Sequence, residues 1–272
     1  MPLIITATDF TEVAGNAVNY ACKLALDMGA DILVMNCYSF PIVFSDMPIP
    51  SPVNDTERIA EEGMDAFMLQ LRKSYPQIAI KSAVIYGNII DAIEEYTESN
   101  ESPSLVVIGN DYSDDNQAWM DSTLLDVFRN LKYPVLAVPH NAAYSPVRKI
   151  GFAYDNKYTG SDVGLVLLRQ LTTTLDAELH VFYDVTDVME KESANEINAS
   201  AKTILSVVKP LYHVFYERDI DASITESIAR YHTDWLAVIP RKHSFFQGLF
   251  HKSHTKALVN HSVIPILALH EV

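Results

Sequence analysis

SLVVIG (residues 104–109), a polar loop, DSTLLDVFRNL (121–131) and PVLAVP (134–139) follow one another in the middle of the chain. The first and last runs are short, apolar and rich in β-branched residues, and the segment between them has helical periodicity. A strand, a loop, a helix and a second strand at this spacing are typical of a buried parallel sheet. The stretch therefore predicts the closing unit of an α/β domain.

The same unit occurs again near the C-terminus, as DWLAVIP (234–240), SHTKALVNH (253–261) and PILAL (265–269). Four matching pairs are each separated by 131 positions: Leu105 and Leu236, Val107 and Val238, Ser122 and Ser253, and Pro134 and Pro265. This internal repeat predicts two domains, residues 1–145 and 146–272, called here the first and second repeats. A length of 272 residues with 49% hydrophobic content is sufficient for two cores.

The composition excludes several classes of partner. The net charge is −15, which argues against nucleic acid and anionic membranes, because both need clustered Lys and Arg. No apolar run approaches the roughly 18 to 20 residues that span a bilayer, and MPLIIT at the start has no basic flank, so we expect a cytoplasmic protein. Cys22 and Cys37 are then expected to be unpaired thiols.

The first repeat predicts alternating strands and helices. Strands are expected at 3–7, 31–37 and 78–86, and Thr11 is expected to cap a helix that stops at Gly29. The apolar positions expected to face inward from the three helices are Ala14, Ala17, Val18, Ala21, Leu24, Ala25 and Met28, then Ile59, Phe67, Met68 and Leu71, then Ile89, Ile90 and Ile93. Residues 39–56 contain four prolines and predict a long loop, either folded onto its own domain or acting as a lid.

The second repeat predicts the same order without the proline-rich loop. Strands are expected at 149–155, 178–183 and 213–217, and helices at 159–175 and 194–208. A further helix should turn Ile224 and Ile228 inward. Five strands alternating with four helices make a doubly wound sheet, which binds ligands at the carboxyl ends of the strands where the strand order reverses. The residues that follow strands at such points are Asp9, Gly109, Asp155 and Pro240.

Taken in order, these motifs resemble the universal stress protein family in its tandem two-domain form. The matching features are TDFT (8–11), VVIG (106–109) and the Ser122 helix running into PVL (134–136), each with a counterpart in the second repeat. The resemblance implies two five-stranded domains of the adenine nucleotide alpha hydrolase-like fold, packed as a pseudo-dimer. It also implies ATP or AMP with magnesium as the ligand, although the residues themselves leave the cofactor unknown.

In ATP-binding members of that family, an Asp that matches Asp9 and Asp155 lies near the adenosine. A Gly, two residues, Gly, nine residues, Gly and Ser or Thr cradle the phosphates through backbone N–H groups. This chain keeps the first glycine as Gly109, and it keeps the serines Ser122 and Ser253. In the first repeat the second glycine position holds Tyr112, and the third holds Ser122 or Asp121, depending on the direction of counting. In the second repeat the three glycine positions hold Pro240, His243 and Lys252 or Ser253. Asp9, Gly109 and Ser122 therefore form a degenerate first-repeat site.

Charge separates the two phosphate loops. Residues 110–121, the acidic loop, hold four carboxylates and no cation, so we expect no unassisted triphosphate there. Residues 241–255, the basic loop, hold Arg241, Lys242, Lys252 and three histidines. The candidate nucleotide or anion site is therefore made of Asp155, Arg241, Lys242, Ser253 and Thr255, with an exposed basic loop without a ligand as the alternative.

Other patterns in the basic loop leave alternatives open. His243, His251 and His254 could bind zinc, although no paired cysteines accompany them. The aromatic residues between 245 and 250 could cover a lipid or a partner, or pack against their own domain. We find no set of nucleophile, base and orienting group, so we expect a binding or signalling protein, with a weak nucleotide hydrolase or transferase as the alternative.

The last strand of each repeat also predicts an assembly. Residues 134–138 and 265–269 would each end a sheet with an open edge, and an open edge pairs readily with another strand. Covalent linkage favours pairing within the chain. We therefore expect an internal pseudo-dimer with these strands adjacent, to which a homo-oligomer can be added.

Overall fold

The computed structural model describes residues 1–39, 53–110, 120–154, 161–184, 198–215, 220–240 and 264–270. It divides into two compact units, 1–109 and 110–272. Both have the α/β architecture that the sequence predicts. The boundary after residue 145 separates the sequence repeats, and it stays a prediction.

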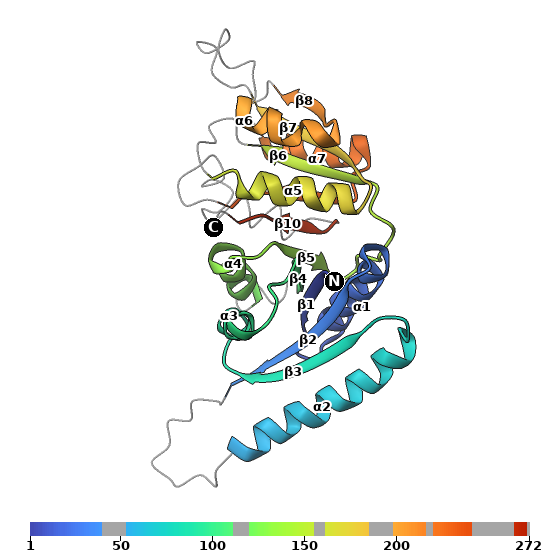
Figure 1. Cartoon of the computed structure of the whole chain (residues 1–272), viewed down its shortest axis with the longest axis vertical. Coiled ribbons are helices and arrows are strands. Elements are labelled where there is room, and N and C mark those ends of the chain that lie inside the picture. The colour runs from blue at the N-terminus through green and yellow to red at the C-terminus, as the bar shows by residue number, and fades with distance from the viewer. Residues whose placement is uncertain are drawn as a thin grey trace. The chain divides into compact units, whose positions relative to one another are not determined.

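The first unit is a parallel sheet with helices on both faces (Figure 1). Its strands lie in the order β3-β2-β1-β4, with bounds β1 Leu3–Ala7, β2 Asp31–Tyr38, β3 Ile80–Tyr86 and β4 Leu105–Asn110. The connecting helices are α1 Glu12–Met28, α2 Val53–Ser74 and α3 Ile89–Ser99. The chain moves outward from β1 to β3 and then returns to the other side of β1, so the strand order reverses between β1 and β4.

Helix α1 forms as its sequence predicts. The Thr11 hydroxyl accepts a hydrogen bond from the Ala14 N–H at 3.3 Å, and Gly29 ends the helix in the left-handed conformation with φ 61°. Its buried residues recur mainly at intervals of three and four: Ala17, Val18, Tyr20, Ala21, Cys22, Leu24 and Ala25. Helix α3 likewise buries Ile89 and Ile93.

Helix α2 differs from the prediction in its extent and its buried face. It begins at Val53, so the expected loop ends before residue 56; residues 40–52 of that loop lie outside the described residues. Ile59 was expected to face inward, but it is 62% exposed. The buried positions are instead Ala60, Met64, Met68 and Leu71, a spacing of four and three that leaves Ile59 off the buried face. Strand β3 begins at Ile80, two residues later than expected.

The six strands of the second unit lie in the order β5-β10-β9-β6-β7-β8. Its strands are β5 Val135–Pro139, β6 Lys149–Tyr154, β7 Glu178–Asp184, β8 Leu211–Phe215, β9 Trp235–Val238 and β10 Ile266–Ala268. Its helices are α4 Met120–Asn130, α5 Val163–Thr174, α6 Ala199–Leu205 with the 3-10 turn η2 Ser206–Val208, and α7 Ile220–Tyr231.

The pairing of β5 with β10 confirms that the last strands of the two repeats lie adjacent. The two strands run antiparallel, with Ile266 opposite Ala137 and Ala268 opposite Val135. The other strand pairs of this sheet, from β10 to β8, are parallel. Every residue of β5 and β10 is buried, so the joint between the repeats is part of a hydrophobic core.

Three predicted boundaries in the second repeat need correction. Helix α6 begins at Ala199 and not at 194, because Asn198 caps it by accepting a hydrogen bond from the Ser200 N–H at 2.9 Å. Strand β8, Leu211–Phe215, begins two residues earlier than the expected start at 213, and residues 216 and 217 lie outside the described residues. Helix α5 begins at Val163, after Asp162.

The first and fourth strands pair in the same way in both repeats, but equivalent residues of the fourth strands are not 131 positions apart. Equivalent backbone bonds start the pairing, from Ser104 N–H to the Leu3 carbonyl and from Asp234 N–H to the Lys149 carbonyl, each 2.8 Å. Ser104 thus corresponds to Asp234, at an offset of 130. Gly109 therefore corresponds to Ile239 and not to Pro240.

No helix in the described part of the chain is both long enough and apolar enough to cross a bilayer.

Candidate functional site

The carboxyl ends of β1 and β4 hold the first-repeat candidates. The strand order reverses between these two strands, and this is where doubly wound sheets bind their ligands. Thr8–Thr11 follow β1, and Gly109 lies at the end of β4. The structure brings Asp9 and Gly109 to the same feature, the first turn of α1.

Asp9 caps the turn that leads into α1. One carboxylate oxygen, Oδ1, accepts hydrogen bonds from the Thr11 N–H at 3.0 Å and from the Thr11 hydroxyl at 2.6 Å. The same hydroxyl accepts from the Ala14 N–H. The backbone N–H groups of Thr11 and Ala14 therefore have partners within the chain, and the exposed Asp9 carboxylate adds a negative charge beside this end of α1.

Phe10 holds the middle of this turn in an uncommon conformation. Its φ is 66°, in the left-handed region that non-glycine residues rarely adopt. Its N–H donates to the Thr8 hydroxyl at 3.0 Å, and its ring lies 6.1 Å from the Phe67 ring, measured between centroids. A Cβ placed on Gly63 would lie 3.0 Å from the Phe10 ring, so the glycine lets α2 pack closely against this ring. These contacts fix the path of residues 8–11.

Gly109 has a packing role. A Cβ at this position would lie 3.0 Å from both the carbonyl oxygen and the Cγ1 atom of Val13. One of these atoms belongs to the helix backbone, which cannot move without displacing the first turn of α1. Gly109 thus permits close approach of β4 to α1. The resemblance predicted a glycine that lets the backbone approach a phosphate, but the close neighbour found here is the protein itself.

Buried polar groups lie beneath the turn, and sequence reasoning missed them. The Asn36 side-chain N–H donates to the Thr8 carbonyl at 2.8 Å. Among the described residues, neither Asn36 Oδ1 nor the Thr6 hydroxyl has a hydrogen-bond partner, although both atoms are buried. A polar residue inside the apolar strand DILVMNCY was the available signal. Together with Asp9, Asn36 gives this end of the sheet an excess of acceptors.

The second-repeat candidates Asp155, Arg241, Lys242, Ser253 and Thr255 lie outside the described residues. So do the histidines at 243, 251 and 254 and the loop at 111–119. Ser122 lies in the first turn of α4, but its side chain is likewise not described.

At the end of β9, among the described residues, the glycine and the large side chain have exchanged places relative to the contact between Gly109 and Val13. Here the strand end carries the large side chain, Ile239, and the helix carries the glycine, Gly164. A Cβ on Gly164 would lie 3.2 Å from Ile239 Cδ1. The N-terminus of α5 also differs from that of α1, because Asp162 makes no side-chain cap and instead accepts from the Ser200 hydroxyl at 2.7 Å.

Cysteines and metal ligands add no second site in the part of the chain that the structure describes. Cys22 and Cys37 are free thiols whose pKa burial raises to about 12 and about 11, so both are protonated at neutral pH. No group of three or more His, Cys, Asp or Glu residues with metal-site geometry occurs within the described ranges.

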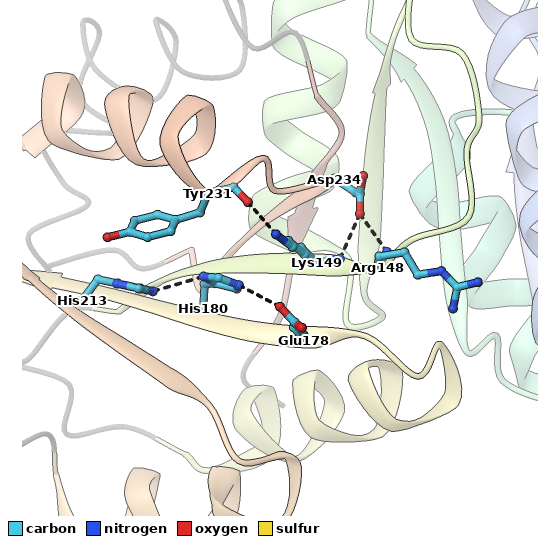
Figure 2. Close-up of polar contacts among 7 residues, drawn as sticks. All are labelled: Arg148, Lys149, Glu178, His180, His213, Tyr231 and Asp234. Carbon is cyan, nitrogen blue, oxygen red and sulfur yellow. Dashed lines mark hydrogen bonds and ion pairs between the residues drawn. The ribbon is translucent and has the colours of Figure 1, made fainter.

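A histidine pair in the second unit was also missed. His180 on β7 and His213 on β8 lie in contact on the face of the sheet covered by α7 (Figure 2). His180 alternates with Glu178 and Phe182 along one strand, which signals a shared face, but its cross-strand partner requires the register of β7 on β8.

The fold and this site can be compared with known proteins. The model of the universal stress protein family matches residues 2–139, about half of the chain. The chain belongs to the universal stress protein family. No curated protein matches it by sequence.

Solved structures share the fold over the whole chain. A universal stress protein from Archaeoglobus fulgidus DSM 4304 has a TM-score of 0.73 at 13% identity, with 98% of each chain covered. A functionally unknown protein from Pseudomonas aeruginosa PAO1 has a TM-score of 0.64 at 13% identity, covering 100% of this chain and 93% of the other. A putative universal stress protein from Pseudomonas aeruginosa UCBPP-PA14 has a TM-score of 0.63 at 12% identity, covering 99% and 93%. At such identities the likeness concerns the fold alone.

Proposed function

We propose that this chain is a non-enzymatic stress-response protein that binds an adenine nucleotide, or another phosphate-bearing anion, in its second repeat. The residues proposed to bind it are Asp155, Arg241, Lys242, Ser253 and Thr255, and the first repeat is proposed to hold no phosphate. Membership of the universal stress protein family supports the stress-response role.

The observation that carries the proposal is that side chains at the start of α1 already accept from nearby backbone N–H groups. Phosphates bind at helix N-termini through free backbone N–H groups. At α1, Thr8, Asp9 and Thr11 already accept from the N–H groups of residues 10, 11 and 14. The four carboxylates of the acidic loop would repel a phosphate.

The second repeat has the opposite character in its sequence. Arg241 and Lys242 follow β9 by three and four positions, and Asp155 directly follows β6. Two exposed cations contribute up to about 1 kcal/mol each to phosphate binding, and this contribution falls as salt rises. The missing glycines weaken both repeats, but the second has replacement donors.

Calorimetric titration of the whole chain with ATP, ADP and AMP tests this assignment. The whole chain is needed because β5 of the first repeat pairs with β10 of the second. Changing Arg241 and Lys242 together to Ala should weaken ATP binding by up to roughly 30-fold, the equivalent of about 2 kcal/mol. Asp9→Ala should leave it unchanged.

A charge-matched control removes two cations elsewhere in the second repeat, Lys202 and Arg230, which lie in α6 and α7. This double Ala variant should bind ATP as the natural chain does. Weakening by Asp9→Ala, without an effect of the basic-loop variant, would refute the assignment. Turnover of ATP with magnesium that Asp155→Ala abolishes would instead favour the hydrolase alternative.

A further inference from the structure

The histidine pair, His180 and His213, is held by a direct hydrogen bond between two imidazole rings. His180 Nδ1 lies 3.1 Å from His213 Nε2. The ring planes are 11° apart while the ring centroids are 5.2 Å apart, so the rings meet edge to edge and nearly in one plane. Figure 2 shows the two nitrogens facing one another. One nitrogen must donate and the other must accept.

This geometry favours a shared proton over a metal ion. In a hydrogen bond each nitrogen points directly at the other, whereas two metal ligands point at a common third point. The described residues supply no third ligand in reach, since no metal-binding group of three occurs among them. The ionisable character of the pair is therefore its chemical property.

Aromatic rings surround the pair, in which His180 is buried and His213 is partly exposed. The Tyr231 ring centroid at the end of α7 lies 4.0 Å from that of His213 and 5.4 Å from that of His180. Phe182, on the same face of β7, lies 5.4 Å from His213, and Phe215 lies 6.0 Å from Phe182. His180 is buried, at 3% exposure. Burial among rings disfavours positive charge on the pair.

Charged groups approach the pair from β6 and β7. Glu178 Oε2 lies 3.5 Å from His180 Nε2, on the ring edge away from His213. Lys149 on β6 donates to the Tyr231 carbonyl at 3.2 Å, which brings its ammonium to the same face. Asp234 accepts from the backbone N–H groups of Arg148 and Lys149 at 2.7 and 2.9 Å. In α7, Glu226 and Arg230 are exposed and pair with each other.

The number of protons bound to the histidine pair decides whether its hydrogen bond can form. The neutral pair keeps its bond with one donor and one acceptor. A first proton is also accommodated, because His180 can then donate from Nδ1 to His213 and from Nε2 toward Glu178. A second proton places N–H against N–H at 3.1 Å, with two positive charges beside Lys149. Double protonation therefore breaks the bond.

We propose that the histidine pair is an acid-sensitive fastening of edge strand β8 to β7, closed while the pair carries at most one proton and opened by the second. β8 lies at the end of the strand order in its unit, so it has one strand neighbour, and its pairing with β7 is its only ladder in the described sheet. Leu211 and Tyr212 are already partly exposed. Opening would uncover the edge of β7 for another strand.

The direction of the pH effect follows from burial. Desolvation lowers the pKa of His180, partly opposed by Glu178, and lowers the pKa of His213, with His180 adding repulsion. Since both folded pKa values lie below the ordinary value of about 6.5, the unfolded chain binds more protons in acid. The stabilisation is complete above about pH 6.5 and is lost as the pH falls through the folded values.

Hydrogen exchange of the whole chain at pH 7.5 and 5.5, corrected for the intrinsic rate, tests the proposal. Amides of residues 211–215 should open at least about tenfold more often at pH 5.5, the change that one pKa unit gives. Amides of β1 and β2, in the first unit, should not share the increase. His213→Gln keeps a neutral hydrogen-bonding group and should reduce the increase to the part that His180 alone contributes, and Glu178→Gln should shift its midpoint to lower pH.

His140→Gln is the matched control, because His140 is an exposed histidine of the same unit outside the pair. It should retain the full increase. If His213→Gln does not fold, proton NMR titration of the imidazoles in the natural chain decides instead, with two coupled transitions expected below pH 6.5. The proposal is overturned if β8 opens no more than the rest of its unit in acid, if His213→Gln keeps the full increase, or if the two rings titrate independently.

Discussion

Gly151 shows how a single missing methyl group positions the aromatic cluster around the histidine pair. A Cβ at this position would lie 2.7 Å from Phe182 Cε2 and 3.4 Å from Thr233 Cγ2. Phe182 is 1% exposed and contacts His213 and Tyr231, so its ring has no free space to enter. The glycine is therefore needed for close packing between β6 and β7.

Gly151→Ala should lower the free energy of unfolding by about 1–3 kcal/mol, the usual cost of overpacking a core. Urea denaturation followed by circular dichroism measures the change. Gly15→Ala is the control, because nothing lies within 4 Å of a Cβ there and α1 is helical throughout. It should stabilise the protein by about 0.5–1 kcal/mol. Equal effects of the two substitutions would contradict the packing described here.

At the residue scale, the sequence predicted the roles of single residues more reliably than it predicted which residues they contact. Thr11 and Gly29 were predictable because caps depend on local hydrogen bonds and backbone conformation. Gly109 was identified as a close-approach glycine, but its neighbour, Val13, could not be deduced from spacing. Asn36 and His213 were missed because their partners, the Thr8 carbonyl after β1 and His180 on β7, lie beside another strand, and such neighbours are defined by the sheet register.

His270 connects two elements that come from different repeats. It follows β10, and its Nε2 donates to the Phe128 carbonyl in α4 at 2.6 Å. The ring is buried, and burial lowers its pKa, although bonding to backbone carbonyls of Phe128 and Tyr133 opposes the shift. The neutral ring thus satisfies a carbonyl at the end of α4, where helix carbonyls lack partners within the helix.

His270→Leu should destabilise the protein by about 1–3 kcal/mol, because it leaves the buried Phe128 carbonyl without its donor. His270→Gln, which retains a side-chain N–H, should recover part of the loss. Chemical denaturation at pH 7.5 measures both. A Gln variant no more stable than the Leu variant would show that packing, and not the hydrogen bond, accounts for the effect.

At the scale of elements the alternation of strands and helices was predictable, and helix phase and strand register were less so. Ile59 was placed inward because α2 has more apolar positions than its buried face can hold. The offset of 131 was read from matching residues that include Leu105 and Leu236 in the fourth strand, where the backbone bonds give 130. Because of this difference of one residue, Pro240 was predicted as the counterpart of Gly109, whereas the structure gives Ile239.

The joint between β5 and β10 is the feature of the whole molecule that the repeat itself predicted. An antiparallel pair of equivalent strands has twofold symmetry, so the same edge can also pair with its own copy. Residues 1–146 expressed alone should therefore dimerise through β5, as measured by light scattering. Ala137→Pro, which places a ring within the strand and removes an N–H, should make the fragment monomeric. A fragment that is monomeric without this substitution would contradict the open edge.

Charge distribution is the second property of the whole molecule, and it separates the repeats where the fold does not. Residues 1–146 hold 7 basic and 20 acidic residues, whereas residues 147–272 hold 13 and 15. The strands of the two repeats follow the same order, β3-β2-β1-β4 in the first and β8-β7-β6-β9 in the second. A phosphate-bearing ligand would therefore distinguish them by electrostatics and by the availability of N–H donors.

The most direct test of this account is methyl NMR of the whole chain with Mn²⁺-ATP, whose paramagnetic ion broadens signals close to the phosphates. Val13 lies in the first turn of α1 against Gly109, and Ile239 lies at the end of β9 against Gly164. If the phosphates bind in the second repeat, the Ile239 methyl signals should broaden while those of Val13 keep their linewidth. Broadening of Val13 with an unchanged Ile239 would contradict binding in the second repeat.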